Sequence, residues 1–209
     1  MTTLCGLILA AGASSRMGRD KALLPWPPAN SSGTTLLSSA VAALQPFAAH
    51  IVVVAGKNAD KLAPIVASCG ASMAHNPAPE RGQFSSLQIG LRQVLGQGCN
   101  AAMITPVDCP PLSASSLQLL CQAFEQALAS GHWAVAPEHN SRRGHPLLAA
   151  RPLIDAFLAA PVSGNARDVR RAHAQHISSI PVPDPGLVAD LNTPEQYAAA
   201  SAIPGQGPR

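Results

Sequence analysis

The sequence predicts an α/β fold, a three-layer α/β/α sandwich around a mostly parallel, mixed sheet. Short apolar runs alternate along the chain with helical periodicities, which is the pattern of βαβ units. Residues 51–55 (IVVVA) are apolar throughout, as expected of a strand covered by helices on both faces. The chain has 209 residues, 47% of them hydrophobic, which suffices for one core. We therefore expect a single domain over 1–200 and a flexible tail over 201–209.

Each element follows from its own local pattern. The expected strands are the apolar runs at 4–10, 51–55, 71–75, 101–105, 133–136, 147–149 and 177–182. Apolar residues at helical spacing predict helices near 37–44, 60–69, 87–95, 117–128, 152–159 and 165–173. Pro64 is compatible with the second helix only in its first turn, so that helix should begin near Asp60. Residues 193–196 (TPEQ) carry the capping-box pattern and predict a last helix. The alternation as a whole indicates a Rossmann-like sheet.

Composition excludes several classes of protein. The net charge is only +3, no Lys/Arg-rich run occurs, and few aromatic residues are present to stack on bases, which argues against nucleic-acid binding. The five cysteines form no C-x-x-C pair, which argues against a disulfide framework and a zinc site. No apolar run reaches the roughly 20 residues of a membrane helix, and residues 1–11 lack the basic start of a signal peptide. We expect a cytoplasmic protein without a membrane partner.

The segment that follows the first strand carries the strongest functional signal. Residues 11–21 (AGASSRMGRDK) combine small residues, which let the backbone approach a ligand, with the cations Arg16, Arg19 and Lys21. This combination predicts a polyanionic ligand, and the alternative is a glycine-rich turn with solvated charges. The spacing is that of neither a Walker A loop nor a dinucleotide-binding G-x-G-x-x-G motif.

Residues 9–21 (LAAGASSRMGRDK) resemble the signature loop of nucleotidyltransferases with the nucleotide-diphospho-sugar transferase type of fold. Within that superfamily they are similar to the molybdenum-cofactor cytidylyltransferases and guanylyltransferases. The resemblance implies that the loop wraps the phosphates of an NTP and that Arg16 and Lys21 are the catalytic cations. The nucleotide-binding residues that it implies in this segment are Leu9, Ala10, Ala11, Gly12, Ser14, Ser15, Arg16, Gly18 and Lys21.

Two carboxylates are candidates for holding a magnesium ion. Nucleotidyl transfer depends on positioning and on charge neutralisation, and Mg²⁺ needs one or two carboxylates beside phosphate oxygens and water. Asp108 follows an apolar strand at the edge of the sheet where open α/β folds bind ligands. Asp190 lies in ADLNTP, which resembles the family's late metal-binding motif. The alternatives are a helix-start aspartate and an Asx turn. We expect Lys21 and Asp108 to be solvent-accessible.

The remaining candidate residues divide between nucleotide and acceptor. The resemblance implies that Asn76, Ser85 and Ser86 hold the base and ribose, although ordinary helix capping also explains the serines. The family commonly has a Trp where this chain has residues 78–81 (APER). Gly144 and His145 match a motif on the acceptor side, with residues 164–167 (GNAR) as a weaker match.

The preferred function is transfer of CMP from CTP to molybdopterin, with Mg²⁺ as cofactor and release of pyrophosphate. Ala11 and Arg19 stand where the guanylyl branch usually has glycines, which favours CTP over GTP. The alternatives are another phosphorylated acceptor (a sugar, an isoprenoid precursor or a phospholactate) and a non-catalytic nucleotide-binding domain. A molybdoenzyme or its chaperone is a possible recipient of the product.

Overall fold

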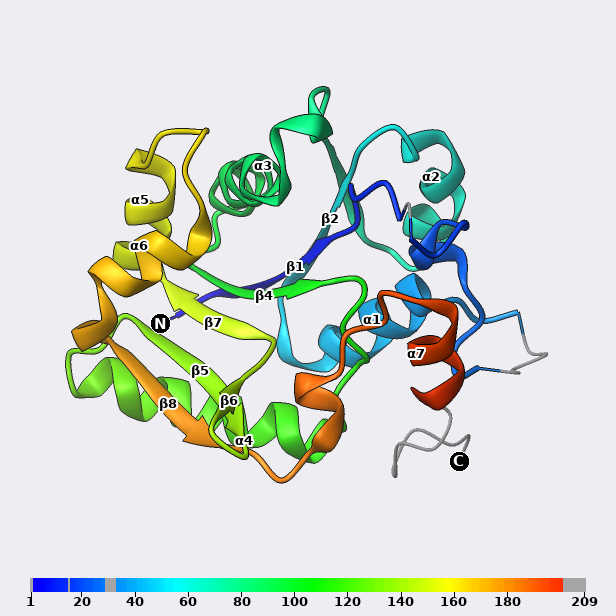
Figure 1. The fold of residues 1–209 in the computed structure, drawn as a ribbon. Coiled ribbons are helices and arrows are strands. Elements are labelled where there is room, and N and C mark those ends of the chain that lie inside the picture. The colour runs from blue at the N-terminus through cyan, green and yellow to red at the C-terminus, as the bar shows by residue number, and fades with distance from the viewer. Residues whose placement is uncertain (1, 15, 29–32, 201–209) are drawn as a thin grey trace.

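The computed structural model describes residues 2–14, 16–28 and 33–200. These residues form an eight-stranded sheet in the order β3-β2-β1-β4-β7-β5-β6, with β8 paired to β5 (Figure 1). The strands are β1 (Leu4–Leu9), β2 (His50–Ala55), β3 (Ser72–His75), β4 (Ala101–Pro106), β5 (Ala134–His139), β6 (Arg142–Arg143), β7 (Leu147–Ala150) and β8 (Ile177–Pro181). The first four are parallel, and β7 runs antiparallel to both β4 and β5. The predicted mostly parallel, mixed sheet is confirmed.

Helices cover both faces of this sheet, as the predicted three layers require. The helices are α1 (Leu36–Leu44), α2 (Ala59–Ser68), α3 (Gln83–Gly96), α4 (Ala114–Ala129), α5 (Arg151–Ala159), α6 (Ala166–Ala172) and α7 (Pro194–Ala199). In Figure 1, α3 and α5 lie above the sheet while α1 and α4 lie below it. The two main parts of the core accordingly lie on opposite faces, with α1, α2 and α4 packed on one face and α3 and α5 on the other, and a small third cluster contains Trp26, Leu36, Leu191 and Ala200.

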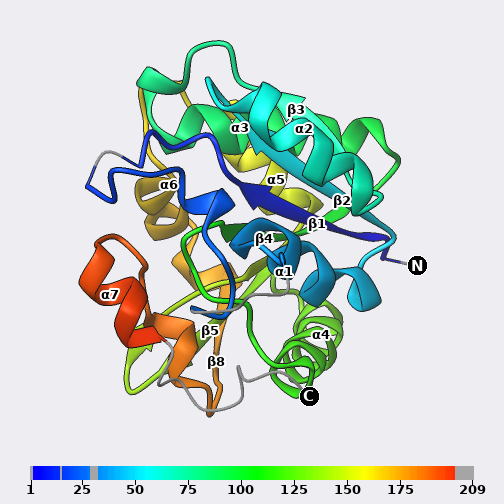
Figure 2. The ribbon, with the colours of Figure 1, turned by 90° about the vertical axis from the view of Figure 1, so that its right-hand side faces the viewer.

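Strands β1 and β4 lie in the middle of the sheet, and their carboxyl ends position the candidate site. Leu9 pairs with Pro106 at the last step of the β1–β4 register, so the segments that follow both strands leave the sheet side by side. Helix α3 packs closely over β1, because a Cβ at Gly90 would lie 2.5 Å from Leu7 Cδ1. This close approach brings the start of α3 to the same edge of the sheet (Figure 2).

The structure differs from the sequence prediction in a few places. Helix α2 begins at Ala59, so Pro64 is its sixth residue and lies in the second turn rather than the first. Strand β5 extends to His139 and forms with β6 a hairpin that the sequence analysis did not predict. The capping box at Thr193 is confirmed. The expected flexible tail lies outside the described residues. In the described ranges, no helix has both the length and the apolar character needed to cross a membrane.

Candidate active site

The loop after β1 is folded by its own backbone and by one serine. Ser14 and Gly18 have positive φ angles of 50° and 68°, so the chain turns sharply at both positions. The N–H of Met17 donates to the carbonyl of Ser14 at 3.0 Å, and Ser14 Oγ accepts from the N–H of Lys21 at 3.2 Å. The short side chains thus let the loop curl so that Lys21 returns toward the sheet. Ser15 lies outside the described residues.

The side chain of Asn58 holds this loop in place. Its Nδ2 donates to the carbonyl of Ala10 at 3.0 Å and to Asp20 Oδ2 at 2.7 Å, which are the two ends of the loop. Its Oδ1 accepts from the N–H of Gly56 at 3.0 Å. One carboxamide therefore ties both ends of the loop to the turn between β2 and α2. Nothing in the sequence pattern marked this residue.

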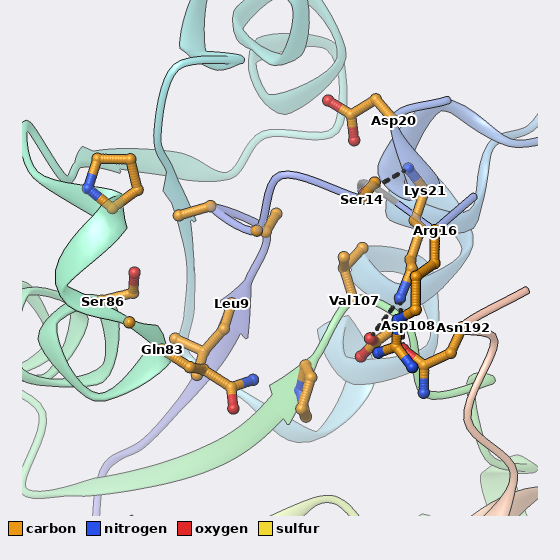
Figure 3. A pocket seen from close by; sticks show the side chains of 16 residues that line it. Leu9, Ser14, Arg16, Asp20, Lys21, Gln83, Ser86, Val107, Asp108 and Asn192 are labelled. Carbon is orange, nitrogen blue, oxygen red and sulfur yellow. Dashed lines mark hydrogen bonds and ion pairs between the residues drawn. The ribbon is translucent and has the colours of Figure 1, made fainter. Parts of the chain in front are cut away.

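Lys21 lies at the centre of a polar cluster that joins three distant segments (Figure 3). Its Nζ donates to Asp108 Oδ2 at 2.9 Å and to Asn192 Oδ1 at 2.7 Å. Arg16 Nη2 donates to the same amide oxygen at 3.4 Å, a long hydrogen bond. The predicted convergence of Arg16, Lys21 and Asp108 is therefore observed. Asn192 is an additional member that the sequence analysis passed over.

The expected exposure of Lys21 is wrong. The residue is only 8% exposed, because its ammonium group turns inward onto Asp108 and Asn192. The side chain of Asp108 is 28% exposed and keeps access to solvent. Lys21 is thus a buried cation whose ammonium group is already paired with a carboxylate and an amide oxygen.

A cavity of about 290 Å³, here called the first cavity, opens beside this cluster. Its predicted lining residues are Leu9, Ala10, Ala11, Gly12, Ser14, Arg16, Lys21, Ser86 and Asp108. Gln83 and Asn192 also face into it, and Pro79 lines it as well (Figure 3). Gly18 lines instead a neighbouring hollow, together with Lys57 and Lys61.

The residues expected at the base and ribose have different environments. Asn76 is buried, and its Nδ2 donates to Ser85 Oγ at 3.0 Å and to Ser86 Oγ at 2.9 Å. Ser85 Oγ in turn donates to the carbonyl of Gly82 at 2.8 Å, so neither serine is the N-cap of α3. This network fixes the start of α3, and of its three predicted members only Ser86 faces the first cavity. A role for Asn76 and Ser85 in nucleotide contact stays a prediction.

Asp190 lies close to Asp108 but not in the lining of the first cavity. Burial raises the pKa of the Cys109 thiol well above its usual value, and the charges of Asp108 and Asp190 raise it further. Cys109 Sγ lies 3.9 Å from Asp190 Oδ1. The two carboxylates therefore flank one cysteine. Across the described part of the chain, no three side chains of the His, Cys, Asp or Glu type converge as a metal-binding group.

A second cavity of about 390 Å³ adjoins the first, and the two share Leu9, Gly82, Gln83 and Pro106. Its wall is apolar, formed by Leu9, Phe84, Leu87, Ile104, Leu147 and Phe157. Its charged or titratable lining residues are Arg81, His145, Arg167 and Arg170. Among the residues that the structure describes, no carboxylate lines it. The cavity thus combines an apolar surface with cations that lack an acidic counterpart.

Of the two predicted acceptor residues, His145 lines the second cavity, whereas Gly144 serves packing. A Cβ at Gly144 would lie 2.1 Å from the carbonyl oxygen of Leu187, so only glycine fits there. His145 Nδ1 lies 3.4 Å from the carbonyl of Ile104. Desolvation, and then the charge of Arg170, lower the pKa of His145. The imidazole is therefore held neutral, and since a carbonyl only accepts, the contact favours Nδ1–H and leaves Nε2 as an acceptor.

The residues that sequence reasoning missed are Asn58, Asn192 and Arg170. Asn192 lies in the segment ADLNTP, two residues after Asp190. Its position was therefore covered in the sequence analysis, but no role was assigned to it. Asn58 and Arg170 stand in a turn and on a short basic helix, where a single sequence gives no reason to separate them from solvated neighbours.

Comparison with known proteins gives a consistent result. Residues 6–177 match the MobA-like NTP transferase domain family. A molybdenum cofactor cytidylyltransferase from Escherichia coli (strain K12) is 28% identical over 203 residues and 96% of either chain. A molybdenum cofactor guanylyltransferase from Xanthomonas euvesicatoria pv. vesicatoria is 29% identical over 92% of either chain.

Solved structures share the fold at lower sequence identity. A nucleotidyl transferase from Methanothermobacter superposes with a TM-score of 0.75 at 19% identity, covering 95% of each chain. A Mycobacterium tuberculosis protein solved in complex with manganese has a TM-score of 0.73 at 18% identity, covering 97% of this chain and 100% of that one. The predicted Rossmann-like fold is confirmed.

Proposed function

Because the chain belongs to the MobA-like NTP transferase domain family, we propose that it transfers CMP from CTP to the phosphate of molybdopterin, using Mg²⁺ and releasing pyrophosphate. The observation that carries the proposal is the pair of joined cavities. One contains Arg16, Lys21 and Asp108, and the other has an apolar wall and several arginines, with no carboxylate among its described lining residues. A nucleoside triphosphate suits the first cavity, and a phosphorylated ring compound suits the second cavity.

The chain's own groups account for the bond-making step. An oxygen of the acceptor phosphate attacks the α-phosphorus, and a new P–O bond forms. The bond from the α-phosphorus to the bridging oxygen breaks, and pyrophosphate leaves with the electron pair. Arg16 and Lys21 stabilise the charge that develops on the triphosphate, and the rigid loop orients it for in-line attack. No side chain has to form a covalent intermediate.

The carboxylates present fit a divalent cation. Asp108 has a partly exposed carboxylate at the cavity wall, and Asp190 lies near enough that both act on Cys109. Mg²⁺ is commonly held by one or two carboxylates together with substrate phosphate oxygens, so these two residues would hold it. The ion would neutralise charge on the α-phosphate and on the leaving group. The manganese complex of the Mycobacterium tuberculosis relative supports a divalent ion in this fold.

The acceptor end of the proposal depends on the second cavity. Its apolar wall suits a flat ring system, and a neutral His145 offers Nε2 to a donor group of that ring. Arg81 and Arg167 supply positive charge at the same cavity. The relatives from Escherichia coli and Xanthomonas are a cytidylyltransferase and a guanylyltransferase of molybdenum cofactor, which supports molybdopterin as the acceptor.

The choice of CTP depends on the loop sequence. Ala11 and Arg19 replace glycines that the guanylyl branch usually has, and the Escherichia coli relative is a cytidylyltransferase. GTP is the second candidate, because guanylyltransferases match this chain at similar identity.

The test is a pyrophosphate-release assay with the purified full chain, molybdopterin and CTP, GTP or ATP, each with Mg²⁺ or with EDTA. We expect release with CTP and Mg²⁺ and a cytidine dinucleotide product by mass spectrometry. Lys21→Met should lower turnover by roughly 10²-fold or more. Arg151→Gln, which removes an exposed arginine paired with Asp155 on α5, is the matched control and should leave turnover unchanged. Faster release with GTP would reassign the nucleotide, and no release with any NTP would overturn the proposal.

A further inference from the structure

Arg170 is a cation in the second cavity whose charge the protein does not offset. It lies on α6, is half-buried, and lines the cavity beside His145. Desolvation lowers its pKa, and the positive charges of Arg143 and Arg167 lower it further. Within the described ranges, Arg170 has no hydrogen-bond or ion-pair partner. Its surroundings therefore disfavour the very charge that it carries.

The neighbouring Arg171 shows that this environment is particular to one position. Arg171 is exposed, and its Nη2 donates to Asp168 Oδ1 at 2.8 Å on the same helix. Arg143 is likewise engaged, with its Nε donating to Ser179 Oγ at 3.1 Å. Arg170 alone of these three combines partial burial, like-charged neighbours and a place in the cavity lining. Folding gains nothing from such an arrangement, whereas a bound anion would relieve both the repulsion and the desolvation.

The position of Arg170 relates it to the reacting groups. The charge of Arg170 lowers the pKa of His145, while the charges of Asp108 and Asp190 act on the same imidazole in the opposite direction. His145 therefore lies within electrostatic reach of both the α6 arginine and the two carboxylates. The second cavity shares Leu9, Gly82, Gln83 and Pro106 with the first, so an anion held by Arg170 would lie in a cavity that adjoins the proposed triphosphate site.

We propose that Arg170 is the residue that binds the phosphate of the acceptor in the second cavity. This inference rests on the proposed function, because it assigns a substrate-binding residue to the acceptor end of the same site. Guanidinium binds phosphate oxygens through two parallel N–H bonds, so Arg170 both attracts the phosphate and orients it. The phenylalanines and leucines of the wall then contact the ring. The residue is a substrate-binding one and takes no part in triphosphate binding.

The test separates the acceptor from the nucleotide. Phenyl phosphate, a minimal aromatic phosphate monoester, serves as the probe, with binding followed by NMR titration in the absence of nucleotide. We expect Arg170→Gln to weaken phenyl phosphate binding by roughly 10- to 100-fold, which is the range of a lost charge-assisted hydrogen bond. Arg170→Lys should retain part of the affinity. Arg171→Gln, the control on the same helix, should bind as the wild type does, and CTP affinity should be equal in all four proteins.

Three outcomes decide the matter. Equal phenyl phosphate titrations for wild type and Arg170→Gln, including no saturable binding by either, would overturn the assignment. A loss of CTP affinity in Arg170→Gln would also overturn it, since the arginine would then serve the triphosphate. Binding that depends on Arg170, in a protein that releases no pyrophosphate from any NTP with molybdopterin, would uphold the phosphate site and reject the proposed function alone.

Discussion

Replacement of Asp108 by asparagine should change nucleotide affinity and turnover in opposite directions. The carboxylate accepts a hydrogen bond from Lys21 Nζ at 2.9 Å, whereas in the proposed complex it would hold the metal ion. The substitution keeps the shape of the side chain and one acceptor oxygen while removing a negative charge. Lys21 is then freer to pair with phosphate, but a metal ligand is lost.

The structure sets the size of both effects. Two unit charges 2.9 Å apart attract each other by roughly 6 kcal/mol at an effective dielectric constant of about 20. Desolvation of Lys21 and the partial exposure of Asp108 cancel most of this, so we take about 1 to 1.5 kcal/mol as the net release. That corresponds to roughly 5- to 10-fold tighter binding of metal-free CTP. Loss of an electrostatic catalytic group should lower turnover by about 10²- to 10³-fold.

Two measurements test this pair of effects. Calorimetric titration of CTP in EDTA gives the metal-free affinity, and pyrophosphate release with Mg²⁺ gives turnover, both with the thermal unfolding midpoint as a check on folding. Asp155→Asn, which alters an exposed carboxylate paired with Arg151 on α5, is the control and should change neither. If Asp108→Asn bound metal-free CTP no more tightly than the wild type, or kept its turnover, the reasoning from the Lys21 pairing would be refuted.

Three further changes test single contacts. Asn58→Ala removes the hydrogen bonds to Ala10 and Asp20 that hold the two ends of the loop after β1. The KM for CTP should therefore rise by about tenfold, with the acceptor KM unchanged. Gly144→Ala forces a Cβ against Leu187 and should lower the free energy of unfolding in urea by roughly 1–3 kcal/mol or more. The pKa of His145 is lowered from 6.5, so the unfolded chain binds the extra proton below that pH. The free energy of unfolding should therefore fall as the pH drops through about 6.5, and His145→Gln should flatten that slope. An unaltered CTP KM, undiminished stability or equal pH slopes would contradict the respective contact.

The parts of the fold that the sequence predicted are those with strong local signals. The apolar run at 51–55 predicted a strand and the capping box at Thr193 predicted a helix start, each from only a few residues. Both predictions were confirmed. The β5–β6 hairpin was missed because its second strand is only the two arginines 142–143, which carry no alternating pattern. The predicted start of α2 near Asp60 was confirmed to within one residue, but Pro64 is the sixth residue of the helix and lies in its second turn rather than its first.

The site was predictable to the extent that its chemistry is sequence-local. Small residues followed by Arg16 and Lys21 predict that the loop after β1 binds phosphate, and the position of Asp108 just after an apolar strand indicates a site residue. Which side chains pair with these residues depends on how distant segments of the chain pack together. The cluster of Trp26, Leu36 and Leu191 packs the last segment against the loop after Lys21, and this packing brings Asn192 to the lysine. Such long-range contacts leave no periodicity in the sequence.

The two cavities differ in whether a lining cation is already paired with a carboxylate: Lys21 is, and Arg170 has no such partner among the described residues. Lys21 is held by Asp108 and Asn192, so an anion entering the first cavity competes with a carboxylate unless a divalent ion takes that carboxylate over. Arg170 has no such competitor among the described residues, so an anion in the second cavity meets an available charge. CTP affinity should then depend strongly on Mg²⁺ in the wild type and weakly in Asp108→Asn, whereas phenyl phosphate affinity should be the same with Mg²⁺ and with EDTA. Under the proposed function, the metal would take over Asp108 and free Lys21 for the triphosphate, whereas Arg170 would bind the acceptor phosphate with or without the metal.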